Sequence, residues 1–283
     1  ILSAAGASPL GRAEHAPHAQ SMHLGPEEVG PPLAFLPKEL PRSIHSLHLE
    51  ADAVSRHGVR MLAKARPPAL HTLSLARSTL RGPDLAPLCE WLQGGPSGSP
   101  RCGLLALNLR YNRLADAGAQ QLLESLCLGG KSGGCVLRSL DLAGNQLTVG
   151  VIDHVSKLVS SLTSLFELSL LDNAFVAGLT VVNGLRGALP PVEAIRALPG
   201  LFSNLPAAMH AGSKSKDLLI AVLSTTSLCE LQVDGGFFAA QDAARLQERL
   251  AKNRELRLSS LEQSHLGADA PPTSSASGGG GGR

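Results

Sequence analysis

A pattern of leucines separated by polar residues recurs along the middle of the chain. Its clearest form, LxxLxLxxNxL, occurs three times between residues 104 and 175, and more degenerate copies lie on either side. In the central LxL the two apolar side chains point to one side of a short strand, and the residues around them point to the other. The pattern therefore predicts short strands in the copies that start at Ile44, Leu70, Leu104, Leu137, Leu165 and Leu228.

Each clear copy continues with an asparagine and then with a helical pattern. Asn112, Asn145 and Asn173 follow the strands, where a side-chain amide can bond the backbone of the turn. Asp116 stands where the N-cap of the next helix is expected. The apolar residues that follow have helical spacing and predict buried faces at Ala119, Leu122, Leu123 and Leu126, and at Ile152, Val155, Val159 and Leu162.

One strand–turn–helix unit cannot bury its apolar side alone, so the copies must stack. The units resemble leucine-rich repeats of the ribonuclease-inhibitor type, in which strand and full helix alternate. The resemblance covers about 44–256. It implies an α/β fold, a leucine-rich repeat solenoid or horseshoe with short parallel strands on the concave face and helices on the convex face.

The segments around the repeats predict the domain organisation. Residues 1–32 are rich in Ala, Gly and Pro and are expected to form a disordered N-terminal arm. The leucine-rich repeat domain is expected at 33–258, and the Gly- and Ser-rich residues 259–283 form a flexible tail. A long gap before the last copy contains an insertion, about 176–216, which its prolines predict to project as a loop.

Helical caps are expected at both ends of the repeats. Residues 33–42 would cap the first repeat. A final helix, 239–252, would cap the last together with Leu256 and Leu258, and would pair Glu248 with Lys252 across one turn.

Composition narrows the class of protein. The 283 residues carry a net charge of +2, which gives no general attraction to nucleic acid. No apolar run is long enough to span a bilayer, so no membrane contact is expected. The five cysteines have neither zinc-ligand nor CxxC spacing and predict reduced thiols, hence an intracellular, cytoplasmic protein. The chain starts at Ile1 and not at Met, which is consistent with a fragment.

No motif in the sequence predicts enzyme chemistry. Phosphate-binding and nucleophile motifs are missing from the sequence, so no catalytic residue, cofactor or metal ligand is assigned. Asp153 and His154 are adjacent on a helix and are expected to be solvated. One alternative stays open. Repeats of this type also build a GTPase-activating protein of nuclear transport, and Arg110, at a strand end, has a place from which to reach a partner's nucleotide.

The positions that face away from the leucines define the expected binding face. Five acids and one arginine occupy them, so a concave face of this kind would select a basic segment of another protein, unless these residues are merely solvated. We therefore expect a non-enzymatic protein-interaction scaffold or adaptor that uses this face and the insertion. The partner-binding residues would be His48, Glu50, Asn108, Arg110, Asp141, Glu167, Glu230, Gln232 and Asp234.

Overall fold

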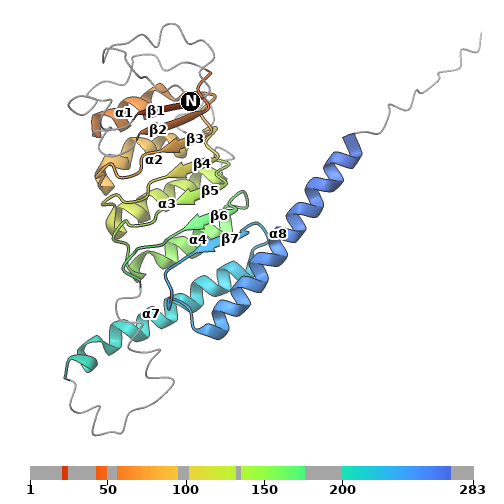
Figure 1. Ribbon diagram of the computed structural model, residues 1–283. Coiled ribbons are helices and arrows are strands. Elements are labelled where there is room, and N and C mark those ends of the chain that lie inside the picture. Colours follow the sequence, from red (N-terminus) through yellow and green to blue (C-terminus); the bar gives the residue numbers. More distant parts are fainter. Residues whose placement is uncertain are drawn as a thin grey trace, which may run out of the picture.

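The structure, a computed structural model, alternates strands and helices along the chain (Figure 1). It describes residues 21–24, 43–49, 56–94, 102–131, 135–175 and 199–268. The strands are β1 (Ser21–Leu24), β2 (Ser46–Leu49), β3 (Thr72–Ser74), β4 (Ala106–Asn108), β5 (Ser139–Asp141), β6 (Glu167–Ser169) and β7 (Glu230–Gln232). The helices are α1 (Arg56–Ala65), α2 (Ala86–Leu92), α3 (Ala115–Lys131), α4 (Ile152–Ser161), α7 (Pro199–Ser224) and α8 (Ala240–Ala268). Short 3-10 helices, Gly82–Leu85 and Val149–Val151, lead into α2 and α4.

The strands form one parallel sheet in chain order, β1 to β7. The six strands predicted from the leucine pattern are all present, and the first leucine of each LxL stands opposite the corresponding leucine of the next strand. These leucines are at most 6% exposed. The prediction that the strand leucines share one side of the sheet is thus confirmed at Leu47, Leu73, Leu107, Leu140, Leu168 and Leu231.

Strand β1 was not predicted. It lies in the segment 1–32 that composition marks as a disordered arm, yet it pairs with β2 from Ser21↔Ser46 to Leu24↔Leu49. The expectation is therefore wrong at these residues. The segments SMHL and SLHL differ at one position only, so β1 is a further copy of the β2 strand in a region with no asparagine to mark the repeat.

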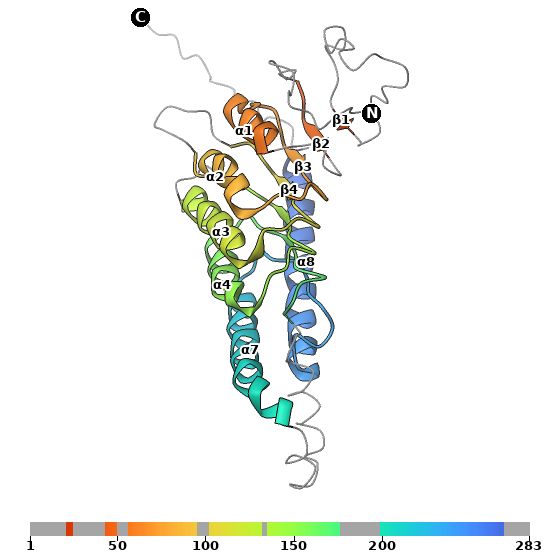
Figure 2. The same cartoon turned by 90° about the vertical axis from the view of Figure 1, so that its left-hand side faces the viewer.

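Helices α1, α2, α3, α4 and α7 lie in a row on one side of the sheet, each in contact with the next in chain order, whereas α8 contacts α7 but lies apart from this row (Figures 1 and 2). The predicted apolar faces of α3 and α4 are buried, with Leu122 and Leu123 fully covered and Leu162 3% exposed. Together with the strand leucines they form one continuous aliphatic core. We call the opposite side of the sheet, which no helix of this row covers, the open face.

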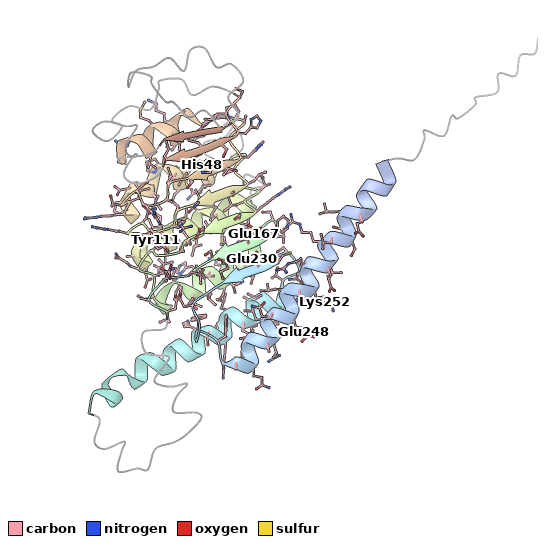
Figure 3. The ribbon with its side chains drawn as sticks, viewed as in Figure 1. His48, Tyr111, Glu167, Glu230, Glu248 and Lys252 are labelled. Carbon is pink, nitrogen blue, oxygen red and sulfur yellow. The ribbon has the colours of Figure 1, made fainter. Side chains whose placement is uncertain are left out.

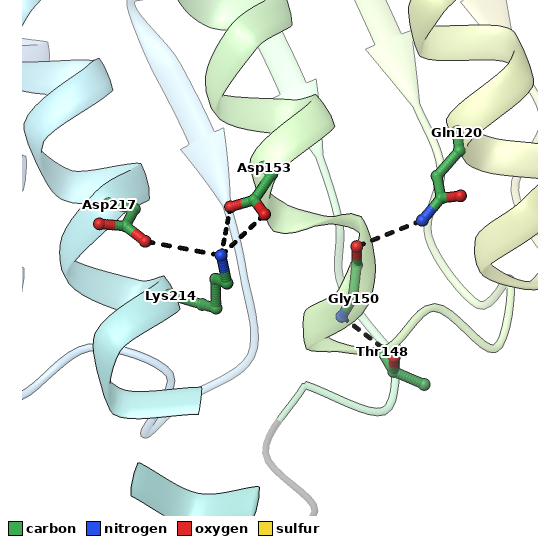
Figure 4. A network of polar contacts seen from close by, with 6 residues as sticks. All are labelled: Gln120, Thr148, Gly150, Asp153, Lys214 and Asp217. Carbon is green, nitrogen blue, oxygen red and sulfur yellow. Dashed lines mark hydrogen bonds and ion pairs between the residues drawn. The ribbon is translucent and has the colours of Figure 1, made fainter. Parts of the chain in front are cut away.

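The second half of the insertion is helical, contrary to the prediction of a loop. Residues 199–216 belong to α7, which packs against α4, so its C-terminal part is the helix of the repeat between β6 and β7. Lys214 of α7 contacts Asp153 of α4 at 2.6 Å and Asp217 at 3.9 Å (Figure 4). His154 contacts Glu124 at 3.2 Å. Asp153 is solvent-exposed as expected, whereas His154 is partly buried, and each makes a contact that the sequence does not predict.

Helix α8 closes the last repeat but is longer than predicted. Leu246 and Leu250 are buried as expected, whereas Leu256 and Leu258 are 51% and 55% exposed and take no part in the cap. The helix continues to Ala268, into the segment expected to be a flexible tail, and runs clear of the sheet (Figure 1). Glu248 and Lys252 lie exposed without an ion pair between them in the described structure.

Several predicted segments lie outside the described residues. These are the cap at 33–42, the first part of the insertion at 176–198, and the tail beyond 268.

The asparagines tie neighbouring repeats together as well as bonding their own turns. Nδ2 of Asn112 donates to the carbonyls of Leu75 and Leu109 at 2.8 Å, and its Oδ1 accepts the N–H groups of Ser78 and Leu80 at 3.1 and 3.0 Å. Asn173 makes the same contacts with the repeat before it. Each amide therefore satisfies buried backbone groups of two repeats at once.

The expected N-cap role of Asp116 is also corrected. Asp116 lies within the first turn of α3, and its carboxylate accepts the backbone N–H of Thr148 at 2.7 Å and the Thr148 hydroxyl. Thr148 in turn accepts the N–H of Gly150 at 3.2 Å and caps the next helical segment (Figure 4). Asp116 thus joins two repeats instead of capping its own helix.

The burial of the strand leucines can be tested with Leu142→Ala. The side chain is fully buried, so the substitution should lower the free energy of unfolding by about 2–5 kcal/mol through lost burial and a cavity. The matched control is Ser139→Ala on the open face, where the change should be close to zero. Equal losses in urea titrations of the two variants would contradict the assigned faces.

The turn asparagines are predicted to contribute unequally to the free energy of unfolding. Asn112 bonds through both amide atoms, whereas Oδ1 of Asn145 is buried without a hydrogen-bond partner in the described structure. Asn145→Ala should cost about 1–3 kcal/mol, because carbonyls of two repeats lose their donor, and Asn112→Ala should cost more. Urea titration measures both, and the reverse order would contradict the account.

Candidate functional site

The open face is built from the outward positions of each strand. Alternation along β4, β5 and β7 places one buried leucine between two more exposed residues, so the outward side chains form rows across the sheet. Thr72, Ala106, Ser139, Glu167 and Glu230 share one row by register. Ser74, Asn108, Asp141, Ser169 and Gln232 share the next.

Three predicted binding residues also accept hydrogen bonds from the turns. Oδ1 of Asn108 accepts the backbone N–H of Arg110 at 3.0 Å, and Oδ1 of Asp141 accepts that of Ala143 at 3.0 Å. The carboxylate of Asp234 accepts the N–H groups of Asp172 and Asn173 at 2.8 and 3.2 Å. At the last repeat the Asp234 carboxylate thereby accepts backbone N–H groups of the preceding turn, as the asparagine side chains do at the earlier repeats.

The other predicted residues divide by position. His48 is half-buried on β2, where its ring shares a 2.7 Å hydrogen bond with Ser46, and Glu50 lies outside the described residues. Glu167, Glu230 and Gln232 remain together on β6 and β7 (Figure 3).

Glu167 and Glu230 stand directly opposite each other on adjacent strands (Figure 3). Sequence analysis places them on neighbouring strands across the insertion, and the register confirms this. Adjacent strands are about 4.8 Å apart, so two negative charges meet on one face. Gln232 donates to Oε1 of Glu230, but neither glutamate has an ion pair with a basic residue in the described part of the chain. We call these two residues the glutamate pair.

Helix α8 borders the glutamate pair, a neighbour that the sequence does not indicate. The guanidinium of Arg257 lies 3.4 Å from the centre of the Phe166 ring, next to Glu167 in the chain. Asn253 is fully buried, and its amide donates to the carbonyls of Leu228 and Thr225 at 2.7 and 3.2 Å. These contacts fix α8 beside the start of β6 and β7.

A second group of side chains lies at the other end of the strands, where they pass into the turns. The residue before each asparagine, and before Ser78 at the equivalent position, has a left-handed backbone, with φ of 54° at Arg77, 55° at Tyr111, 65° at Gly144 and 55° at Asp172. The shared conformation gives these residues equivalent positions on successive turns. Gly144 is required there, because a Cβ atom would lie 2.3 Å from Cδ1 of Tyr111.

Tyr111 connects these turns. Its hydroxyl donates to the Asp172 carboxylate at 2.7 Å, and the guanidiniums of Arg77 and Arg110 lie 5.4 and 4.9 Å from its ring centre. We call Arg77, Arg110, Tyr111 and Asp172 the tyrosine cluster. Sequence analysis singles out Arg110 as an outward residue at a strand end, and the structure holds it over an aromatic ring.

The cysteines offer no reactive thiolate among these contacts. All five are free and buried, and Cys102 and Cys135 face each other in an isolated bridge between repeats. Burial raises the pKa of the Cys102 thiol to about 12 and also raises the pKa of Cys135. Both thiols therefore stay protonated at neutral pH and are poor nucleophiles.

The part of the chain that the structure describes has neither a membrane-spanning helix nor a cluster of metal-ligating side chains. None of its helices is long and apolar enough to cross a bilayer. No three or more His, Cys, Asp or Glu side chains gather there as a metal site would need.

Comparison with known proteins informs the fold and not the site. The sequence matches no family model and no curated protein. Among solved structures, the chain is similar to leiomodin-1 actin-binding site 2, with 14% identity over 76% of this chain and 98% of that one, and a TM-score of 0.53. It also aligns with the tropomodulin C-terminal domain of Caenorhabditis elegans, with 16% identity over 77% and 86% of the two chains, but at a TM-score of 0.36. The first likeness indicates a shared fold, and the second is too loose to carry an argument.

Proposed function

We propose that this chain is a non-enzymatic protein-binding module that holds a basic segment of a partner against the glutamate pair. The observation that carries the proposal is the direct cross-strand juxtaposition of Glu167 and Glu230. Two like charges opposite each other lower the stability of a sheet, and folding does not need them there. A lysine or arginine from a partner would relieve the repulsion and gain two charge-assisted hydrogen bonds.

The surroundings of the glutamate pair suit such a partner. Glu167 is exposed and Glu230 is half-buried, so a side chain approaching the open face can reach both carboxylates. Asp141 adds negative charge on the adjacent strand while its Oδ1 serves a turn. A surface of one sign attracts an oppositely charged segment and orients it before contact.

The shape of the repeats supports a concave binding face. Adjacent strands are about 4.8 Å apart, whereas packed helices need about 8–10 Å between their axes. A stack that keeps both spacings must bend toward its strands, and this is the physical basis for proposing a horseshoe of the ribonuclease-inhibitor type. The open face would then be concave and would surround part of a partner.

Two further observations support the proposal. The solved leiomodin-1 chain of similar fold is named for an actin-binding site, so protein binding on this fold has a precedent. At 14% identity no binding residue transfers, and actin is only the first partner to test. Free, buried cysteines suit the reducing conditions of the cytoplasm, where we propose that the protein acts.

The charge-reversal variant Glu167→Lys/Glu230→Lys tests the binding face. A fluorescent peptide of alternating Lys and Gly should bind the wild-type chain, and the variant should lose about tenfold in affinity at low salt, with a smaller loss at high salt. The thermal midpoint should stay near that of the wild type, because both side chains are partly or fully exposed.

The matched control is Glu90→Lys/Glu248→Lys, which makes the same change in net charge at exposed helix positions. Equal loss in this control would show that total charge, and not the glutamate pair, determines binding. Acceleration of GTP hydrolysis by a partner GTPase would contradict the non-enzymatic proposal and favour the alternative function assigned to Arg110.

A single neutralising change separates binding from folding. Glu167→Gln should raise the free energy of unfolding by about 0.2–1 kcal/mol, because it removes the repulsion across the strands. The same variant should bind the Lys–Gly peptide more weakly than the wild type. A loss of stability in urea titration would mean that the two carboxylates do not repel each other and would remove the main support for the proposal.

A further inference from the structure

Four arginines gather on the two turns that follow β3 and β4. The backbone N–H of Arg77 donates to the carbonyl of Arg110 at 2.9 Å, and Arg81 and Arg113 face each other in a parallel bridge. Two adjacent turns therefore carry four arginines, paired across the repeats by backbone register. We call Arg77, Arg81, Arg110 and Arg113 the arginine edge.

The four arginines outnumber the acids beside them. Among the residues that the structure describes, none of the four arginines forms an ion pair with a carboxylate. Two nearby carboxylates keep their negative charge while they accept neutral donors, Asp84 the backbone N–H of Arg81 at 2.9 Å and Asp172 the Tyr111 hydroxyl. Arg77, Arg81 and Arg113 are exposed and Arg110 is half-buried, so the edge is open to a ligand.

Part of the edge is held in place before any ligand arrives. Arg77 and Arg110 lie over the Tyr111 ring, whose hydroxyl is tied to Asp172 two repeats further on. Gly144 leaves the space that the ring occupies. Guanidinium groups that are already ordered lose less conformational entropy on binding than free ones.

We propose that the arginine edge binds an acidic, carboxylate-rich segment of a partner protein. The planar guanidinium group donates two parallel hydrogen bonds to a carboxylate. A nucleic acid is disfavoured, because the glutamate pair and Asp141 lie on the same sheet and would repel a long polyanion. A short acidic segment can occupy the turns without crossing that region. This surface is separate from the glutamate pair and has the opposite charge, so the two proposals stand or fall independently.

Tyr111 provides a direct probe, since it is the only tyrosine in the chain. Protein labelled with 3-fluorotyrosine should give one fluorine resonance, at the centre of the arginine edge. Titration with a short peptide of alternating Glu and Gly should shift this resonance saturably, and a Lys–Gly peptide should leave it in place. Arg77→Glu/Arg113→Glu should lower the affinity for the Glu–Gly peptide by about tenfold.

The matched control is Arg60→Glu/Arg245→Glu, which makes the same change in net charge at exposed positions on α1 and α8. This control should bind like the wild type, and thermal melting should show that both variants fold. The proposal is overturned if the Glu–Gly peptide does not move the resonance, or if the control loses as much affinity as the test variant. It is also overturned if inorganic phosphate or a short oligonucleotide shifts the resonance while the peptide does not.

Discussion

The fold depends on the asparagine side chains that join each repeat to the one before it. Each turn leaves backbone N–H and C=O groups inside the protein, where an unpaired group is costly. Asn112 and Asn173 meet this requirement with one amide that donates to two turns and accepts from the earlier one. The turns therefore have to stay in register, and the register decides which side chains stand together on the open face and at its edge.

The sequence predicts the parts of the fold that depend on local pattern. Leucine alternation identifies β2 to β7, and the spacing of Leu122, Leu123 and Leu126 identifies the buried face of α3. Composition is less informative at the insertion and at the end of the last helix. Residues 199–216 read as an insertion with prolines, yet they belong to α7, a helix that packs against α4. The length of α8 is likewise hidden, because Leu256, Leu258 and Leu261 are exposed.

The candidate site is predicted less well, because a polar residue on a strand has two uses that look alike in sequence. Asp141 and Asp234 are outward acids like Glu167 and Glu230, but the first two bond backbone N–H groups of turns. Position separates them, since the turn-bonding acids come late in or after a strand and the glutamates come first. The tyrosine cluster is a further case, since its members lie on three turns and meet only through the stacking of repeats.

Helix α8 makes the two ends of the repeat stack unequal in local stability. Asn253, Arg249 and Arg254 bond the carbonyls that lead into β7, so the last repeat is held by a helix as well as by its neighbour. At the opposite edge of the described sheet, β1 pairs with one strand only. In a linear array each unit is stabilised mainly by those next to it, so local opening is cheapest at the less supported end. Slow amide hydrogen exchange would accordingly concentrate toward β5 and β6, and local opening would occur first at the β1 end.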